Sequence, residues 1–410
     1  MRKISGLCLL AGGLVVGACG DDGGGSGNIF PEKPECSGES VVPYAGAHHQ
    51  VISKLEIGSA MDGFDLDDDG DPDNKLAAIA SLAGSAISDS LNNYDIVIPI
   101  EFFDLQAAAP DTCVKFGIYL GDYPTDTDAD GKKAFVAEGD CNDKVAAIKP
   151  GMAEICGDGF DNDCDGVADR TQDAMGLATA CSPFDPGKAD IYLDPLSFSM
   201  GTMSPVIIFK DGVITQGANG LVLDSGPSLF SVAIPVTEGI TLDLRISGAT
   251  IQADVVQAGG AIVLKNGRLG GVIEGKTADT IRGLAVEQIG LLPENSLLDA
   301  TFANLLGPLL ALPKAKESIA KKYPGCRTPD IDVDQDGLEA FCDSNPDDEI
   351  KEVDVCIDGD GTEIKDVGPQ GAVTMHCSEA TLGGKNRFVD GISVALKFET
   401  TAVKSIKPPR

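Results

Sequence analysis

The sequence predicts a mainly β protein, an antiparallel sandwich-like sheet with a few helices and one inserted, disulfide-rich acidic metal-binding module. Between residues 190 and 275, β-branched residues alternate with polar ones and turn signals recur at short intervals. No crossover helices separate these segments, which argues against a parallel α/β sheet. Between residues 122 and 181, aspartate, glycine and cysteine replace that pattern, which indicates an insertion into the sheet.

The N-terminal residues indicate export and anchoring. Two basic residues and an apolar run over residues 4–16 are typical of a signal peptide, here residues 1–18. The small residues before Cys19 resemble the lipobox of bacterial lipoproteins, which implies cleavage before Cys19 and acylation of that cysteine. Residues 19–35 then form a flexible tether. Because Gly20 stands where an inner-membrane retention signal would have Asp, we expect an outer-membrane lipoprotein on the periplasmic or cell-surface face.

The charge of the chain limits its partners. It carries 64 acidic and 31 basic side chains, with a formal net charge of −33. Such an excess repels nucleic acid and anionic lipid headgroups, so we expect contact with the membrane through the lipid anchor alone. Asp outnumbers Glu, and because turns and cation loops favour Asp, most of this charge belongs to loops.

The cysteines indicate disulfide bonds. Of twelve cysteines, ten remain once Cys8 and the lipidated Cys19 are set aside, and an even number in an exported chain favours pairing. We expect the local pairs Cys326–Cys342 and Cys356–Cys377, and we expect Cys36 to attach the N-terminal segment to the body. The other five would staple the central module: Cys113, Cys141, Cys156, Cys164 and Cys181.

The β-rich body is expected over residues 36–400 and opens with a cation loop over residues 65–73. That loop leads into an apolar helical stripe over 76–93, and two strands follow at 96–103 and 114–120. Position twelve of the loop is Leu76, where an EF-hand has a bidentate Glu, so the full EF-hand motif is absent.

The hexapeptide Asp-x-Asp-x-Asp-Gly occurs four times. Its alternating carboxylates can surround one hard cation, and its glycine lets the loop turn back toward the ion. The all-oxygen ligand set favours Ca²⁺, with Mg²⁺ less suitable because it holds its water tightly. The predicted ligands are Asp65, Asp67, Asp69 and Asp73; Asp126, Asp128 and Asp130; Asp161, Asp163, Asp165 and Asp169; and Asp332, Asp334, Asp336 and Asp343.

The acidic module over 126–169 begins with one of these hexapeptides and then reads DCND…PG…EIC…DNDCDG, which ends in another. It resembles the metal-binding motif named after the copper-repressible MopE proteins. That resemblance implies a metal site, and the family name suggests copper. Copper prefers imidazole, thiolate or thioether ligands, and the module contains no His, so its oxygen ligands indicate Ca²⁺ instead.

Short strands are expected after the module. Hairpin signals lie at 210–212 and at Asn266-Gly267, and Ser247-Gly248 separates two further strand segments. The Gly-plus-aliphatic pattern over 242–275 would also suit a lipid groove, although sandwich cores show the same pattern.

Helices are expected at 277–292 and 296–310, followed by a Cys-rich cation-loop region over 326–377. This last loop resembles those of thrombospondin type-3 repeats. Residues 358–361 read as a turn, 388–391 with 392–398 as a final hairpin returning to the sheet, and 401–410 as a C-terminal tail.

The sequence does not predict an enzyme. It has three His residues, no Gly-x-Ser-x-Gly elbow, no His-Glu-x-x-His and no phosphate loop. The His48-His49 pair is expected at the surface. We therefore predict a calcium-binding protein with a structural or surface-interaction role. The alternative is a calcium-dependent adhesin or glycan-binding protein with a cell-surface protein or glycan partner. A hydrolase is a third reading, which the absence of Trp disfavours for sugar cleavage.

Overall fold

The computed structural model spans the whole chain, and the structure describes only part of it. The described residues are 29–30, 35–37, 41–44, 46–80, 87, 91, 96–105, 110–121, 148–149, 190–199, 204–237, 240–258, 261–280, 296, 298, 310–323, 325–345, 347, 353–365 and 388–409.

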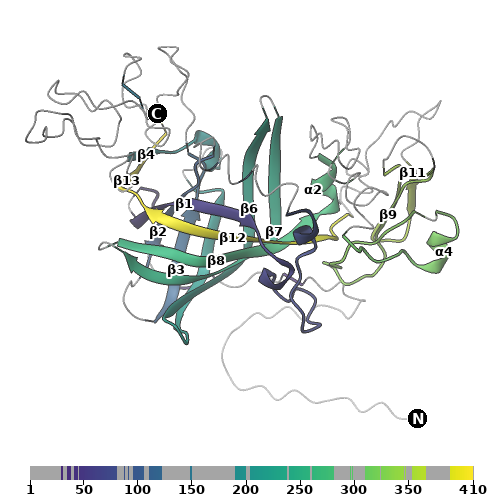
Figure 1. Cartoon of the computed structure of the whole chain (residues 1–410), viewed down its shortest axis with the longest axis horizontal. Coiled ribbons are helices and arrows are strands. Elements are labelled where there is room, and N and C mark those ends of the chain that lie inside the picture. Colours follow the sequence, from purple (N-terminus) through teal and green to yellow (C-terminus); the bar gives the residue numbers. More distant parts are fainter. Residues whose placement is uncertain are drawn as a thin grey trace, which may run out of the picture.

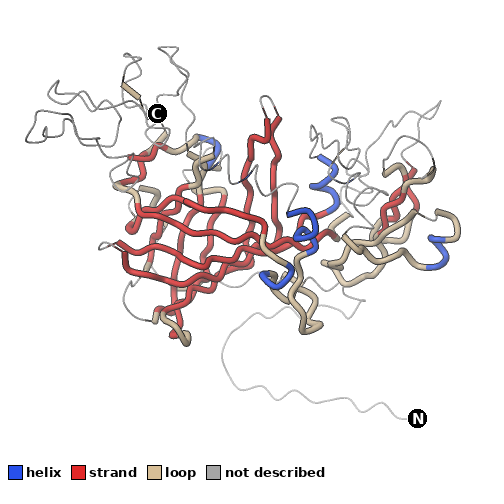
Figure 2. Tube along the Cα trace, viewed as in Figure 1, coloured by secondary structure: helices blue, strands red, loops and turns tan. Residues whose placement is uncertain are grey.

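Eight antiparallel strands close into a barrel in the order β1-β12-β8-β7-β6-β5-β3-β2 (Figure 1). Figure 2 shows that strands dominate the described part of the chain. This confirms the mainly β, antiparallel prediction, but the sheet closes on itself where two stacked sheets were expected. The strands are β1 Ala47–Ile57, β2 Pro99–Asp104, β3 Asp111–Ile118, β5 Ile207–Gln216, β6 Leu221–Thr237, β7 Ile240–Ala258, β8 Ala261–Glu274 and β12 Gly391–Ala402.

Three predicted breaks lie inside long strands. Residues 210–212 belong to β5, residues 247–248 to β7 and residues 266–267 to β8. Each coincides with a shift in strand register, as where β7 pairs Gln252 with Arg268 but Asp254 with Lys265. There one residue of β7 opposes two of β8, which defines a β-bulge. The hairpin predictions at 210–212 and 266–267 are therefore wrong, and the bulges bend the strands as barrel closure requires.

The barrel encloses the main hydrophobic core. On β2, Ile100 and Phe102 belong to this core, because alternate side chains of a strand lie on the same face. The rings of Phe102 and Phe116 lie 5.2 Å apart, and Phe116 stacks on Phe209 at 4.8 Å. These contacts fill the interior with side chains.

A second layer covers the outer face of β2 and β3. Strands β4 Asp190–Tyr192 and β13 Ser405–Lys407 pair in parallel, and the 3-10 helix η4 Pro195–Ser197 follows β4. This differs from the predicted tail at 401–410, since β12 extends to Ala402 and β13 packs on the barrel. The pair Ile191 and Ile406 is buried there with Tyr119.

A buried carboxylate organises that layer. Glu101 is fully buried and accepts hydrogen bonds from the Gly46 N–H at 2.8 Å and the Tyr119 hydroxyl at 3.0 Å. Its Oε1 lies 3.5 Å from His49 Nε2. His48 and His49 belong to β1, and His49 Nδ1 accepts the N–H of Ile406 at 3.3 Å. The expectation of two surface histidines is therefore wrong for His49, which holds strands together.

A small sheet lies beside the barrel, with strands β9 Ala340–Cys342, β10 Val355–Ile357 and β11 Glu363–Lys365 and the short helix α4 Glu317–Ala320 (Figure 1). The predicted Cys326–Cys342 disulfide is present. Cys356 is disulfide-bonded, and its predicted partner Cys377 lies outside the described residues. Residues 358–361 form the predicted turn, with Gly361 at φ 73°.

Cys113 forms a disulfide with Cys36. This confirms that Cys36 attaches the N-terminal segment to the body, but it corrects the assignment of Cys113 to the central module. Cys113 lies on β3, before the inserted residues begin. Its disulfide joins this strand to the N-terminal segment that contains Cys36. The other four cysteines assigned to the module lie outside the described residues.

Short helices complete the described fold: η1 Ala60–Asp62, η2 Lys75–Ile79 and α2 Gly275–Thr280. Within the predicted helix at 76–93, Ile87 and Leu91 are helical and buried in the main core. Of the two later predicted helices, most residues lie outside the described ranges. None of the helices in the described part is long and apolar enough to cross a membrane.

Candidate metal centre

The last cation loop, residues 332–337, lies where the barrel meets the small sheet. Ile331 pairs with Gly391, the first residue of β12, through two hydrogen bonds of 3.2 Å. After the loop the chain enters β9. Both ends of the loop are thus fixed by β structure, which positions its side chains.

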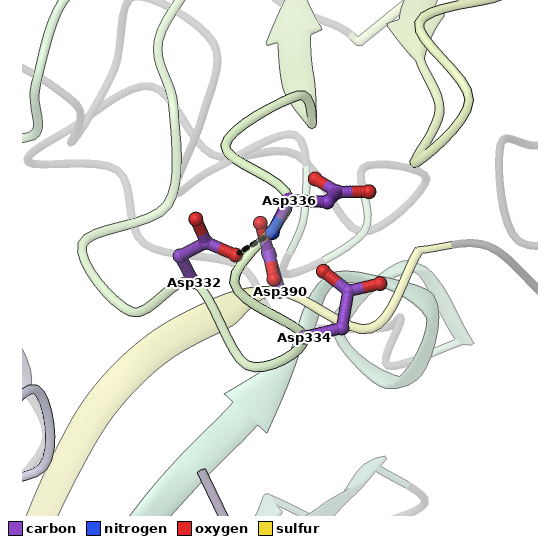
Figure 3. Close-up of side chains that lie close together, drawn as sticks. All are labelled: Asp332, Asp334, Asp336 and Asp390. Carbon is purple, nitrogen blue, oxygen red and sulfur yellow. Dashed lines mark hydrogen bonds between the residues drawn. The ribbon is translucent and has the colours of Figure 1, made fainter. Parts of the chain in front are cut away.

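Four aspartates gather at this loop. One carboxylate oxygen of each lies within 4.8 Å of those of the others, and the four residues are Asp332, Asp334, Asp336 and Asp390. Figure 3 shows three of them on the loop and Asp390 reaching in from the segment before β12. Two backbone N–H groups shape the set: Asp336 donates to Asp332 Oδ1 at 3.0 Å, and Val333 donates to Asp390 Oδ1 at 2.7 Å.

Without a bound cation, the surroundings of this cluster disfavour the ionised form of its carboxylates. Burial, together with the negative charges of Asp332, Asp334 and Asp336, raises the pKa of Asp390 to about 8. Burial is also the main cause that raises the pKa of Asp334 and of Asp336. A raised pKa means that the ionised carboxylates are destabilised by their surroundings. A bound cation reverses this effect, because its charge favours ionised ligands.

Glu339 lies behind the cluster and is 1% exposed. Its two oxygens accept the N–H groups of Val389 and Asp390, each at 3.0 Å. Burial and the nearby charge of Asp390 raise the pKa of Glu339 to about 9. Glu339 therefore fixes the backbone of Asp390 through this hydrogen bond.

Asp334 supplies an independent sign that the site is made for an ion. Its Oδ1 is buried and accepts no hydrogen bond from the described residues. A buried oxygen without a donor costs free energy, and a cation at the centre of the four carboxylates would satisfy it. An all-oxygen set of this kind fits a hard divalent cation, Ca²⁺ in particular.

The first cation loop, residues 65–70, forms a smaller cluster. Oxygens of Asp65, Asp67 and Asp73 lie within 4.8 Å of one another. Asp73 is fixed from two sides, because its N–H donates to the Phe64 carbonyl and its Oδ2 accepts the Leu66 N–H, both at 2.8 Å. Burial, and the charges of the neighbouring aspartates, raise the pKa of Asp73.

The two loops share one backbone conformation. Position four has a positive φ in both, 60° at Asp68 and 59° at Gln335. Position six is the glycine of the motif and also has a positive φ, 94° at Gly70 and 65° at Gly337. Non-glycine residues seldom adopt this region, so its recurrence at matching positions shows that the two described copies of the hexapeptide fold in the same way.

Strand β12 links the two loops. Ser393 accepts a hydrogen bond from the Lys75 N–H at 2.9 Å and donates to Asp330 Oδ2 at 2.5 Å. Asn74, directly after Asp73, accepts the Ala395 N–H at 3.0 Å. Both loops are therefore attached to the same strand within three residues.

The structure brings some of the predicted ligands together in clusters and leaves others outside them. It brings together Asp332, Asp334 and Asp336, and separately Asp65, Asp67 and Asp73. Asp69 and Asp343 lie outside these clusters: Asp69 Oδ1 accepts the Asp71 N–H, and Asp343 Oδ1 accepts the Asn345 N–H. The other predicted positions, Cys19 and the aspartates at 126, 128, 130, 161, 163, 165 and 169, lie outside the described residues.

Asp390 was missed by the sequence reasoning. Its only local signal is the dipeptide Asp390-Gly391, which was interpreted as part of a hairpin turn. The position assigned to the loop's twelfth residue, Asp343, follows the EF-hand spacing. The structure takes the fourth carboxylate from the residue directly before β12 instead, since Gly391 of that strand pairs with Ile331 just before the loop.

Comparison with known proteins identifies one motif. Residues 140–170 match the MopE-type family model described as "Putative metal-binding motif". The match begins at residue 140, covers most of the acidic module predicted over 126–169, and supports metal binding by that stretch. No curated protein and no solved structure matches the chain.

Proposed function

We propose that this chain is a lipid-anchored extracytoplasmic protein that binds Ca²⁺ through its Asp-x-Asp-x-Asp-Gly loops, with a structural or surface-interaction role. The observation that carries the proposal is the gathering of Asp332, Asp334, Asp336 and Asp390, whose oxygens lie within 4.8 Å. Four carboxylates at that spacing repel one another unless a cation lies between them.

The ligand type favours Ca²⁺ over other metals. Within the two described clusters every ligand atom is a carboxylate oxygen, which suits Ca²⁺ and not copper or zinc. The motif match at 140–170 supports further metal sites in the acidic module. We propose a binding protein and not an enzyme, because the sequence offers no nucleophile-and-base motif.

Thermal unfolding tests the calcium proposal. Removal of Ca²⁺ by EGTA should lower Tm by several degrees and added Ca²⁺ should restore it, since a ligand at one hundred times its Kd adds about 2.7 kcal/mol. Mg²⁺ should restore less. Asp334→Asn and Asp67→Asn should each reduce the calcium-dependent shift, whereas Asp68→Asn is the matched control, since residue 68 lies in a loop but in neither cluster. An unchanged Tm in EGTA would refute the proposal.

The lipid anchor is tested separately. Wild-type protein should fractionate with membranes and release an acylated N-terminal peptide beginning at Cys19. Cys19→Ser should move the protein into the soluble fraction while its calcium-dependent Tm stays the same. Retention of the serine variant on membranes would show that another contact holds it there.

A further inference from the structure

Val333 connects the metal centre to the N-terminal segment. It is position two of the last cation loop, and its N–H donates to Asp390 Oδ1 at 2.7 Å. Its carbonyl accepts the N–H of Ile29 at 3.0 Å. One residue therefore joins a carboxylate of the cluster to the first described residue of the chain.

Apolar contacts strengthen this connection. Val272, Ile331 and Val333 form a small buried cluster, against which Ile29 and Phe30 pack. Leu66, position two of the first cation loop, packs against the same cluster. The position-two residues of both loops, Val333 and Leu66, thus share one apolar cluster with Ile29 and Phe30.

The barrel itself is shaped to receive Phe30. Gly248 on β7 has a φ of 63°, and a Cβ on this residue would come within 2.4 Å of the Phe30 ring. Because only glycine allows this approach, the ring lies directly on the backbone of β7. This part of the predicted tether over 19–35 therefore contacts the barrel.

We propose that a divalent cation held by Asp332, Asp334, Asp336 and Asp390 acts as a clasp that keeps Ile29 and Phe30 on the barrel. The inference rests on the proposed calcium binding and adds its consequence. Without the cation, repulsion among the carboxylates loosens the loop. Val333 then shifts, and Ile29 loses its hydrogen bond to the Val333 carbonyl and its packing against the Val333 side chain.

The barrel stays folded when the clasp opens. Its strand ladder and main core do not include the loop. The next part of the N-terminal segment is held without a cation, by the Cys36–Cys113 disulfide and by the Cys36 N–H, which donates to the Lys210 carbonyl. Cation loss therefore frees Ile29 and Phe30 and leaves Glu35 and Cys36 in place.

A single tryptophan reports on the clasp, since the chain contains none. In full-length F30W, we expect a blue-shifted emission with Ca²⁺, and a red shift with stronger acrylamide quenching in EGTA. F198W is the matched control, because Phe198 belongs to the separate cluster with Tyr119 and should not respond. In the F30W protein, Ile29→Pro removes the donor to Val333 and should expose the tryptophan even with Ca²⁺.

Calcium titration calorimetry separates the possible outcomes. If D390N lowers the calcium affinity and abolishes the F30W response, the clasp is supported. If D390N lowers the affinity but EGTA leaves F30W emission unchanged, calcium binds and the clasp is wrong. If the F30W and F198W emissions shift together, the whole fold opens and the clasp is again wrong. If D390N leaves calcium binding unaffected, the proposed metal centre fails and the clasp fails with it.

Discussion

Asp390 accepts a 2.7 Å hydrogen bond from the backbone N–H of Val333, although the two residues are far apart in the sequence. The bond is buried, and it places the Asp390 carboxylate among the three aspartates of the loop. A cation loop that takes one ligand from the residue next to a barrel strand is more rigid than one that supplies every ligand itself. Binding at this loop therefore depends on the barrel.

The first prediction concerns which acid completes the site. Asp390→Asn keeps an acceptor for Val333 but removes a charge, so the calcium affinity of this site should fall at least about tenfold. In EGTA the same change should alter Tm little, because the pKa of Asp390, raised by burial to about 8, already leaves that carboxyl largely neutral at pH 7. Titration calorimetry and thermal unfolding measure the two effects.

Asp343→Asn is the control for that prediction. Asp343 is buried, but it lies outside the cluster, and its Oδ1 accepts the Asn345 N–H. Its substitution should leave the calcium affinity within about twofold of wild type. A larger loss at residue 343 than at residue 390 would restore the EF-hand assignment of the twelfth position.

The candidate site could be predicted only in part. The hexapeptides identify Asp332, Asp334 and Asp336, because alternating acids and a glycine describe one loop locally. Asp390 could not be found this way, since its approach depends on the pairing of Ile331 with Gly391. A single sequence contains no signal for that long-range contact.

The second prediction concerns Asn74, which attaches the first cation loop to β12. Its Nδ2 donates to the Gly58 and Ser59 carbonyls at 2.9 Å, and its Oδ1 accepts the Ala395 N–H. Asn74→Ala leaves these groups without a partner and should lower the free energy of unfolding by about 2–4 kcal/mol. Urea denaturation checks this. Ser53→Ala, which removes one exposed hydrogen bond, should cost no more than about 0.5 kcal/mol.

The third prediction concerns pH. Lys115 is 3% exposed and pairs with Glu35 Oε1 at 3.0 Å, which lowers the pKa of Glu35 below 4.5. A lowered carboxyl pKa adds stability that is present above pH 4.5 and is lost as the pH falls through the pKa of the folded state.

Glu35→Gln should therefore destabilise the protein at pH 7 and have little effect near the acid end of that titration. The comparison is urea unfolding of both proteins across this pH range. Glu317→Gln is the control, because its pair with Lys321 is exposed at the surface and contributes little. An equal loss of stability at pH 7 and at a pH below the pKa of folded Glu35 would show that Glu35 acts through packing and not through its charge.

The strands could be predicted better than their connections. Alternation locates strand residues such as those of β3 and β7, because burial of one face requires it. It does not distinguish a turn from a bulge. Asn266 of the Asn266-Gly267 pair has a positive φ, which suits a turn and a bulge equally, and the choice depends on which strand lies opposite.

The last prediction tests the bulge at residue 266 directly. Asn266 has a φ of 49°, and its Nδ2 donates to Asp254 Oδ2 on the neighbouring strand at 2.8 Å. Asn266→Val places a β-branched residue in the left-handed region and should lower the free energy of unfolding by about 1–3 kcal/mol. Asn266→Gly accepts that conformation and should cost less than about 1 kcal/mol, chiefly for the lost exposed hydrogen bond.

Urea denaturation of the two variants separates backbone strain from the loss of the side chain. If residue 266 were in ordinary extended backbone, the order would reverse, because valine favours a strand and glycine weakens it. The sign of the difference in unfolding free energy between the valine and glycine variants therefore shows whether residue 266 of β8 has a left-handed backbone conformation at the bulge.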